Sequence, residues 1–567
     1  MLHIKTKYYG IQKNYQNDNK SIELLKIKCY NRIIKMIIKE TGGRKKMKFK
    51  RKLLALGLVG TMIFGVGCSA SQDSSNSSSI TTMSIVAGGD AVNLNPLYAN
   101  DRVSLTVMNA LYNPLYVVDK NGEKTFYLAD NVEVSQDFLT YTVKLKSDLK
   151  WHDGQSLTAD DLVFTMESIL DENQASISRG KFVIEDTAVE VNKIDDTTVE
   201  FKLPVVSTSF ETMLGDIRII PKHIYEGEKD LAKSEKNSTP VGNGAYKFKE
   251  YKTGELITLE RFDDYYGEKG NLETITYRVI ADSNSANMAL QNGEVNAKYV
   301  QPDEIADLEG KDNLELVQFD EGMVDNLIFM QNVNETLKDA KVRQALSYAI
   351  NKDEIITAAY KSEEYANKAY SLFASNTMSY TDDVEKYEQD KDKSKELLKE
   401  AGASDLKLKL AYSTHKTQQE KVALVIQSNL KDIGVEVELK PMEKSAFYGE
   451  LFDAKNASFD LALNGYVMGS EPAEYASLFM SDGSDNMSGY ANKEVDKKFK
   501  EALKETDDGK RESLYKEIQQ TLAKDAALYP ISYPKSIVAI DKNYDTTKAN
   551  LAPIFMFRDL NGIAVKN

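Results

Sequence analysis

Cysteine and histidine are scarce in this 567-residue chain, which has two cysteines and four histidines. Cys29 lies in a basic leading segment, so Cys68 is the only cysteine in the rest of the chain. A disulfide framework or a thiolate metal cluster is therefore excluded there. After residue 67 the only histidines are His152, His223 and His415, so a histidine metal site is not excluded but is not expected. We expect neither a metal nor another cofactor.

Motifs of catalysis and nucleotide binding are also missing. The chain has no Gly-x-Ser-x-Gly, no His-Glu-x-x-His and no Walker loop. Gly242-Asn243-Gly244 lacks the third glycine of a dinucleotide fingerprint, and no helical pattern follows it. Trp151-His152-Asp153-Gly154 places a histidine beside an aspartate, but adjacent residues seldom converge on one substrate. We interpret it as a structural turn and expect a protein that is not an enzyme.

Positive charge is scarce after residue 67. Residues 1–67 hold 16 Lys and Arg against 3 Asp and Glu, a net charge of +13. Subtracting this from the whole-chain charge of −15 leaves −28 for the remaining 500 residues. Nucleic-acid binding requires a basic surface that neutralises phosphates, so a nucleic-acid partner is excluded. The acidic surface is typical of a soluble, exported protein.

The apolar run Leu53–Gly67 is only 15 residues long. It is too short to span a hydrocarbon core of roughly 30 Å comfortably. The basic cluster Met47–Lys52 precedes it and Gly65-Val66-Gly67-Cys68 follows, which is the pattern of a secretory leader. Its exit resembles the lipobox of bacterial lipoproteins, in which the cysteine is lipidated and becomes the new N-terminus. The alternative is an ordinary leader with an incidental cysteine.

We therefore expect 47–67 to be a lipoprotein signal peptide and Cys68 to carry the lipid anchor. Residues 68–80 are rich in serine and predict a flexible tether to the outer face of the cell membrane. Residues 1–46 precede the leader, where a secretory protein should have nothing. They are either a basic cytoplasmic extension or the result of a start codon assigned too early, and we favour the second hypothesis.

Hydrophobic periodicity predicts a mixed α/β body. Alternation predicts strands at 83–87, 115–118, 141–146 and 199–203, and antiparallel strands within 241–248, 256–260 and 275–280. The apolar residues Val103, Val107 and Leu111 recur at helical spacing and predict a helix. Further helices are expected, with Thr158, Asp339 and Asn351 as their N-caps. The segments 406–410, 422–430 and 435–439 predict a strand–helix–strand unit with parallel strands.

Several blocks of the sequence resemble a family. These are Leu94-Asn95-Pro96-Leu97, Leu149–Phe164 with its Trp-His-Asp-Gly turn, Pro240–Tyr246 and Val342–Ile350. They are similar to the bacterial extracellular solute-binding proteins of family 5, the receptors of oligopeptide and dipeptide ABC importers. The resemblance implies an α/β, two-lobed Venus flytrap fold with three domains, mixed sheets and a hinge between the lobes.

The resemblance also implies a division of the chain. The expected ranges are domain I in three segments, 81–112, 215–320 and 525–567, an inserted domain II at 113–214, and domain III at 321–524 as the opposite lobe.

An extended peptide can be bound through its main chain as an added strand, which gives affinity with little sequence preference. Its α-amine then needs a carboxylate, because burying an unpaired ammonium is costly. By resemblance the amine partner is Glu471, although the family commonly has Asp there, and Glu474 is the rival. The residues expected to contact peptide are Asn100, Asp101, Arg102, Tyr466, Met468, Gly469, Ser470 and Glu471.

The resemblance thus implies a monomeric receptor that passes peptides to an ABC permease driven by cytoplasmic ATPases. Alternatives are a receptor for a nickel chelate, an opine or another small solute, a secreted hydrolase, or a signalling or adhesion protein. We interpret Arg343, on the helix after Asp339, as part of a surface or interdomain salt bridge.

Overall fold

The computed structural model describes residues 81–566. All the described residues belong to one compact unit. The predicted extension 1–46, leader 47–67, tether 68–80 and lipid-bearing Cys68 lie outside the described residues. Within 81–566 no helix is both long and apolar enough to cross a membrane.

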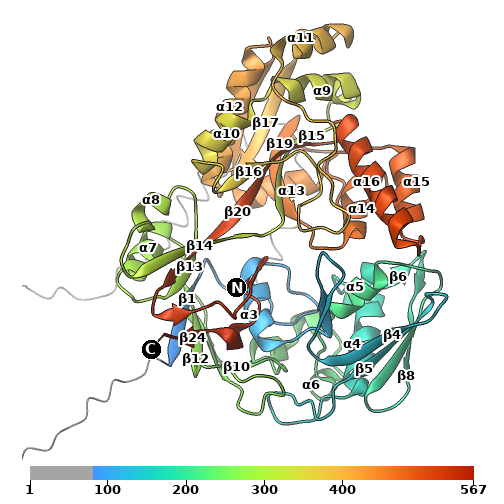
Figure 1. Cartoon of the computed structure of the whole chain (residues 1–567), viewed down its shortest axis with the longest axis vertical. Helices are drawn as coiled ribbons and strands as arrows, with labels where there is room; N and C mark the ends of the chain where they lie inside the picture. Colours follow the sequence, from blue (N-terminus) through green and yellow to red (C-terminus); the bar gives the residue numbers. More distant parts are fainter. Residues whose placement is uncertain (1–80, 567) are drawn as a thin grey trace, which may run out of the picture. The chain divides into compact units, whose positions relative to one another are not determined.

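A mixed sheet of 12 strands runs through this unit, in the order β10-β11-β12-β1-β13-β20-β15-β19-β17-β18, with β14 and β16 paired to β20. The long strand β20 (Tyr529–Asp541) belongs to both parts of the sheet (Figure 1). Its first residues pair with β15 and β16, and its last residues pair with β13 and β14. We call residues 81–320 with 536–566 lobe 1, and residues 322–534 lobe 2.

The other strands of the large sheet are β1 (Thr82–Ala87), β10 (Tyr246–Lys252), β11 (Leu256–Arg261), β12 (Thr274–Val279), β13 (Ala297–Val300), β14 (Leu314–Asp320), β15 (Met323–Phe329), β16 (Ala366–Lys368), β17 (Lys407–Ser413), β18 (Glu436–Met442) and β19 (Leu461–Val467). The smaller sheets contain β2 (Tyr116–Val118), β3 (Lys124–Phe126), β4 (Ala129–Val134), β5 (Thr140–Leu145), β6 (Val183–Ile184), β7 (Thr187–Ala188), β8 (Glu190–Lys193), β9 (Thr198–Lys202), β21 (Tyr544–Asp545), β22 (Leu551–Ala552), β23 (Met556–Phe557) and β24 (Ala564–Val565).

The α-helices are α3 (Arg102–Leu111), α4 (Ala159–Leu170), α5 (Phe210–Gly215), α6 (Lys222–Tyr225), α7 (Ser283–Gln291), α8 (Ile305–Leu308), α9 (Ala340–Ala349), α10 (Lys352–Ile355), α11 (Lys391–Glu400), α12 (Thr417–Lys431), α13 (Lys444–Phe452), α14 (Ala476–Phe479), α15 (Lys493–Ala502) and α16 (Asp508–Lys524).

The predicted local patterns form the elements expected of them. Strands β10, β11 and β12 pair antiparallel, and β17 and β18 pair parallel across the helix α12. Thr158 and Asp161 close a reciprocal capping box at the start of α4, which packs beside the four-stranded sheet β4-β5-β9-β8. Asp339 and Asn351 cap α9 and α10. The domain boundaries expected from the family resemblance remain predictions.

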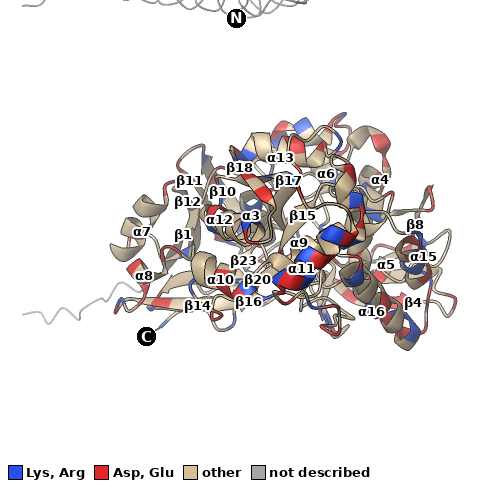
Figure 2. Cartoon of the chain, turned by 90° about the horizontal axis from the view of Figure 1, so that it is seen from above, with Lys and Arg blue, Asp and Glu red and all other residues tan. Residues whose placement is uncertain are grey.

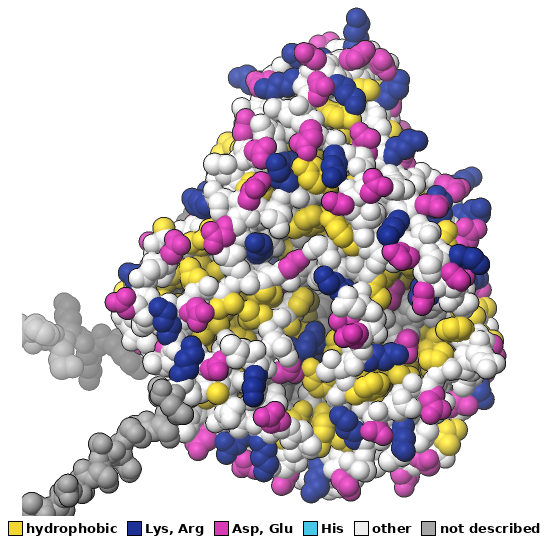
Figure 3. All heavy atoms as spheres, in the orientation of Figure 1, with side chains coloured by type: hydrophobic (Ala, Val, Ile, Leu, Met, Phe, Trp, Pro, Cys, Tyr) yellow, Lys and Arg dark blue, Asp and Glu magenta, His cyan; other side chains and the backbone are white. Residues whose placement is uncertain are grey.

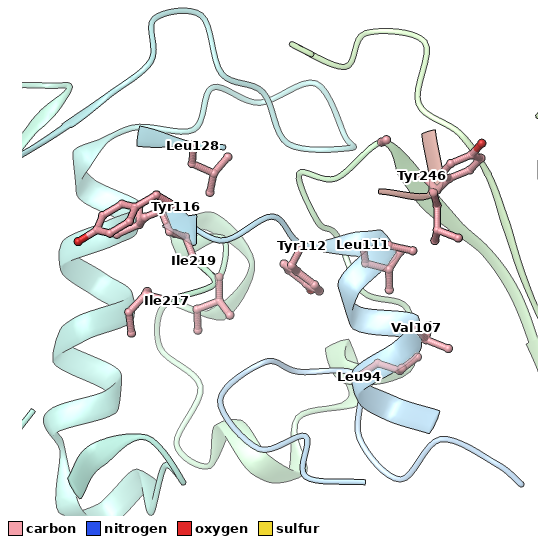
Figure 4. Close-up of a cluster of buried hydrophobic side chains, with 14 of the residues drawn as sticks. Leu94, Val107, Leu111, Tyr112, Tyr116, Leu128, Ile217, Ile219 and Tyr246 are labelled. Carbon is pink, nitrogen blue, oxygen red and sulfur yellow. The ribbon is translucent and has the colours of Figure 1, made fainter. Parts of the chain in front are cut away.

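The core of lobe 1 is built around α3. Val107 and Leu111 are fully buried on the helix face that the spacing predicted, and they lie near Leu94 and Tyr112 (Figure 4). Burying each such side chain contributes roughly 1.5–3 kcal/mol. The N-terminal end of α3, where Arg102 lies, is thus fixed by the packing of its C-terminal turns.

In lobe 2, Arg343 of α9 lies in a place that the sequence did not predict. Its side chain is buried and donates to the carbonyl oxygens of Ala526 at 2.9 Å, Asp525 at 2.6 Å and Leu337 at 2.8 Å. Our interpretation as a surface or interdomain salt bridge is wrong. The guanidinium instead satisfies carbonyl groups after the C-terminal end of α16, where four backbone acceptors have no helical partner.

Charges of both signs are mixed on the surface. Helix α11 carries Lys, Asp and Glu side by side (Figure 2). The described ion pairs are mostly between exposed side chains, such as Lys341 with Glu400 and Lys391 with Asp432. Exposed pairs of this kind contribute about 0–1 kcal/mol each, so the fold does not depend on them.

One buried carboxylate connects the strands that cross between the lobes. Glu321 lies between β14 and β15, and its side chain is 4% exposed. Its carboxylate accepts hydrogen bonds from Nη1 and Nη2 of the Arg102 guanidinium at 2.7 and 3.1 Å. It also accepts the Ser536 hydroxyl of β20 and the Ile554 backbone N–H, each at 2.7 Å. Burial would raise the pKa of Glu321, but these donors and the Arg102 charge outweigh it and lower that pKa.

The Trp-His-Asp-Gly turn binds the Gly-Asn-Gly turn through one imidazole. His152 Nδ1 accepts the Gly242 N–H at 3.0 Å, and Nε2 lies 3.0 Å from the Gly244 carbonyl oxygen. A neutral ring protonated on Nε2 satisfies both contacts. Both glycines are required, since a Cβ at Gly242 would lie 2.0 Å from the Leu111 oxygen and one at Gly244 2.3 Å from the Ala110 oxygen. The turn is structural, as predicted.

Burial lowers the pKa of His152 to about 4. Between pH 6.5 and 4 the His152 imidazole is therefore protonated in the unfolded chain but neutral in the folded chain. The free energy of unfolding falls as the pH falls through this range. We expect about 2 kcal/mol of the unfolding free energy to be lost through His152 between pH 7 and pH 4.5. Urea unfolding of the wild type and of His152→Asn at both pH values tests this. Equal losses in the two proteins would contradict it.

Replacing Glu321 by Gln removes the charge that holds the Arg102 fork while keeping the side-chain shape. Because Arg102 is 42% exposed, solvent compensates part of the loss, and we expect destabilisation of about 1–3 kcal/mol at pH 7. The pKa of Glu321 is lowered on folding, so its contribution is present above pH 4.5 and disappears as the pH falls further. Denaturant unfolding measures the difference, with exposed Glu123→Gln as control; a loss no larger than that of the control would refute the role.

Candidate functional site

The two lobes contact each other at residues far from the crossing strands. The Ser470 hydroxyl donates to the Val118 carbonyl oxygen at 3.0 Å, and the Thr208 N–H donates to the Leu503 carbonyl oxygen at 2.9 Å. Lys181 of lobe 1 forms an ion pair with Glu474 of lobe 2 at 2.8 Å. These contacts join residues 118–208 of lobe 1 to lobe 2, so the lobes meet both at the crossing strands and at this far edge.

A fourth contact joins the two lobes at Asp303. Asp303 accepts the hydroxyl of Thr417 at 3.0 Å and pairs with Lys421, both on α12. In Figure 3 apolar side chains gather in the middle of the face, with charged side chains around them.

The segment predicted to contact ligand leaves β19 and reaches this lobe interface. Tyr466 donates to the Leu372 carbonyl oxygen at 2.6 Å, and Met468 packs on an apolar cluster of lobe 2. Gly469 has φ +75°, a conformation that favours glycine, and its carbonyl oxygen accepts the Thr377 hydroxyl at 3.1 Å. This turn directs Ser470 toward Val118 of lobe 1.

Glu471 and Glu474 lie in different environments. Glu471 is buried, caps the short helix Pro472–Tyr475 by accepting the Ala473 N–H at 3.1 Å, and forms no ion pair within 81–566. Burial raises the pKa of Glu471 to about 7, although the Ala473 N–H and the Thr212 hydroxyl act in the opposite direction. Glu474 is already paired with Lys181.

The three residues expected from lobe 1 lie at the start of α3. Asn100 is exposed, Asp101 caps α3 by accepting the Ser104 N–H at 3.0 Å, and Arg102 is held by Glu321. Arg102 also lies 4.9 Å from the centre of the Tyr299 ring. No hydrogen bond or ion pair of the described residues joins Asn100, Asp101 or Arg102 to the segment 466–471. The sequence analysis assigned Asn100, Asp101 and Arg102 to the same ligand site as the segment 466–471. In the structure only the lobe 2 segment lies at the far edge of the lobe interface.

The sequence analysis missed an acidic residue on the large sheet. Asp325 of β15 lies opposite Gly465 of β19, and its carboxylate occupies the space that a Cβ at Gly465 would enter. It accepts the Tyr360 hydroxyl, and it has no cation partner among the described residues. An acidic residue inside the mainly apolar segment Met323–Phe329 was the available signal. No group of three metal-ligating side chains occurs in 81–566.

Comparison with known proteins gives a consistent answer. The family model for bacterial extracellular solute-binding proteins, family 5 Middle, matches residues 126–488. The oligopeptide-binding protein AppA of Bacillus subtilis is 32% identical over 534 residues, which cover 88% of this chain and 97% of that protein.

Solved structures agree with this match. The ABC transporter substrate binding protein CtaP of Listeria monocytogenes superposes with a TM-score of 0.83 at 44% identity, covering 86% of this chain and 100% of that one. AppA of Bacillus subtilis in complex with a nonapeptide superposes with a TM-score of 0.75 at 28% identity, covering 86% and 99%. The predicted two-lobed α/β fold is confirmed, and the chain belongs to the bacterial extracellular solute-binding proteins of family 5.

Proposed function

We propose that this protein is the extracytoplasmic receptor of a peptide ABC importer, which captures oligopeptides or dipeptides between its lobes and delivers them to the permease. The observation that carries the proposal is the match to an oligopeptide-binding protein over 88% of the chain. The receptor performs no chemistry, and the energy for import comes from ATPases in the cytoplasm. It acts as a monomer.

The two crossing strands supply the hinge. Closure brings Lys181 to Glu474 and Ser470 to Val118 at the far edge. Opening requires these contacts to separate, together with the Thr208–Leu503 hydrogen bond and the contacts of Asp303 with α12. Exposed contacts of this kind are weak, so ligand binding can shift the balance between open and closed forms. Backbone groups of the turn at Gly469 and Ser470 lie where an extended peptide would pass, with Tyr466 and Met468 as pocket walls.

Glu471 is the proposed partner of the peptide α-amine. Its carboxylate is buried without a cation, and a buried carboxylate gains more from an ammonium than an exposed one does. Glu474 is the weaker candidate because Lys181 already neutralises it. On lobe 1, Asn100, Asp101 and Arg102 are proposed to contact the peptide near the hinge.

The cell-surface location is part of the proposal. The leader at 47–67 and the Gly-Cys exit support a lipid on Cys68 and a position on the outer face of the cell membrane. The serine-rich tether would keep the receptor close to its permease while leaving it free to reorient.

Native mass spectrometry of protein purified from cells without refolding tests the function. We expect co-purified, heterogeneous peptides of two to several residues, because binding through the main chain tolerates many side chains. A single metal chelate, or a closed form that carries no ligand, would overturn the proposal.

Glu471→Gln should weaken the binding of free peptides roughly tenfold or more, since a charged hydrogen bond to the amine is lost. Binding of N-acetylated peptides should change little. Because the pKa of Glu471 is about 7, affinity of the wild type for free peptides should also fall as the pH drops below 7 and the carboxylate is protonated.

Isothermal titration calorimetry of both peptide forms at pH 6 and pH 8 measures these effects. Glu474→Gln is the matched control, since it removes a neighbouring carboxylate that already has a cation. Equal losses for free and acetylated peptides in Glu471→Gln would remove Glu471 from the site.

A further inference from the structure

Arg218 is a buried cation that the sites described so far do not use. It lies between Ile217 and Ile219, whose side chains point into the core of lobe 1 (Figure 4). The chain is extended here and forms a β-bridge with Pro114, so Arg218 points away from that core. Its side chain is only 10% exposed, and its guanidinium lies 5.5 Å from the centre of the Phe555 ring.

One edge of the Arg218 guanidinium has no partner. Nη1 lies 3.4 Å from the Asp216 carbonyl oxygen and 3.6 Å from its carboxylate, which are weak contacts. Nε and Nη2 are buried and find no acceptor anywhere in 81–566. These two nitrogens form the side of the fork that receives a carboxylate in a bidentate manner.

An unpaired buried guanidinium is costly, and the surroundings add to the cost. Burial lowers the pKa of Arg218, and Asp216, whose side chain is 62% exposed, offsets this only in part. A second cation, Arg558, lies 5.6 Å from the same Phe555 ring and opposes the Arg218 charge. A buried arginine without a partner stabilises the fold less than an apolar side chain at the same position would. We therefore expect Arg218 to have a functional role rather than a structural one.

The loop that carries Phe555 is strained. Ile554 and Met556 both have φ of +68°, a region that a β-branched side chain rarely adopts. The loop is anchored on one side, where Glu321 accepts the Ile554 N–H and Ile554 accepts the Thr106 hydroxyl. Phe555 follows this anchor directly, and its ring lies over the guanidinium of Arg218.

Arg218 lies between two features of the lobe interface. The loop that carries Phe555 contacts Glu321 at the crossing strands. On the other side, Asp216 acts electrostatically on Lys181, the lobe 1 member of the ion pair with Glu474. Arg218 thus lies beside the interface between the lobes.

We propose that the Nε–Nη2 edge of Arg218 is a subsite for a carboxylate of the ligand, and that the strained loop carrying Phe555 shifts to admit the carboxylate. The carboxylate can be the C-terminus of a peptide or an acidic side chain. The inference rests on the proposed peptide function for its ligand, but the anion chemistry belongs to Arg218 alone.

The binding test compares wild type, Arg218→Met and Arg218→Lys by calorimetry. The ligands are one peptide as the free acid, its C-terminal amide, and versions with an internal Glu or Gln. We expect Arg218→Met to lose roughly 10- to 100-fold in affinity for the form with the recognised carboxylate and to bind the matching amide or Gln form like the wild type. Arg218→Lys should recover only part of this loss, because it cannot bind side-on.

The matched control is Arg558→Met, which removes a cation from the same ring without altering the free edge. It should preserve the discrimination between carboxylate and amide. Loss of discrimination with the free acid assigns the C-terminus, and loss with internal Glu assigns a side chain. Unchanged discrimination in Arg218→Met overturns the proposal while the peptide function stands.

A second test needs no peptide. Thermal unfolding is followed in sodium acetate and in sodium chloride at equal ionic strength. Acetate should raise the midpoint of the wild type and not that of Arg218→Met, and in chloride the variant should be at least as stable as the wild type. If the wild type binds no peptide, this result still supports the anion site although the peptide function fails. A variant that is clearly less stable in chloride, with the same response to acetate, shows a structural arginine and overturns the proposal.

Discussion

The carboxylate of Glu321 is the interaction on which the arrangement of the lobes depends. Its four hydrogen bonds join both crossing strands, the start of α3 and the loop before Arg558. A hinge must let two bodies rotate while its own residues stay in place. Four donors that converge on one buried acceptor fix the pivot, and the lobes beyond it are held by contacts that are weaker and more exposed.

The two proposals assign opposite charges to the two lobes. Lobe 2 offers the buried Glu471, and lobe 1 offers the unpartnered edge of Arg218. A free peptide carries an ammonium at one end and a carboxylate at the other. A receptor whose lobes have complementary charges therefore stabilises closure around such a ligand and orients its chain, even though the net charge of the protein is strongly negative.

Local sequence patterns predicted the parts of this protein whose partners are close in the chain. The capping box of Thr158 and Asp161 and the parallel pair β17–β18 depend on neighbours within a few turns or one crossover. The two-lobed fold was predicted from the sequence blocks that resemble the solute-binding family. Arg343, Glu321 and Arg218 were not predicted, because Arg343 and Glu321 bond to residues some 180 to 230 positions away. The burial of Arg218 under Phe555 is equally remote.

The position of β20 has a consequence for how the two lobes fold. Both parts of the large sheet need this strand, yet it follows all of its partner strands in the sequence. Until it pairs, β13, β14 and β15 have open edges, which can pair with other chains. Neither lobe can complete its part of the large sheet until β20 pairs, so the topology makes the folding of one lobe depend on the same strand as the folding of the other.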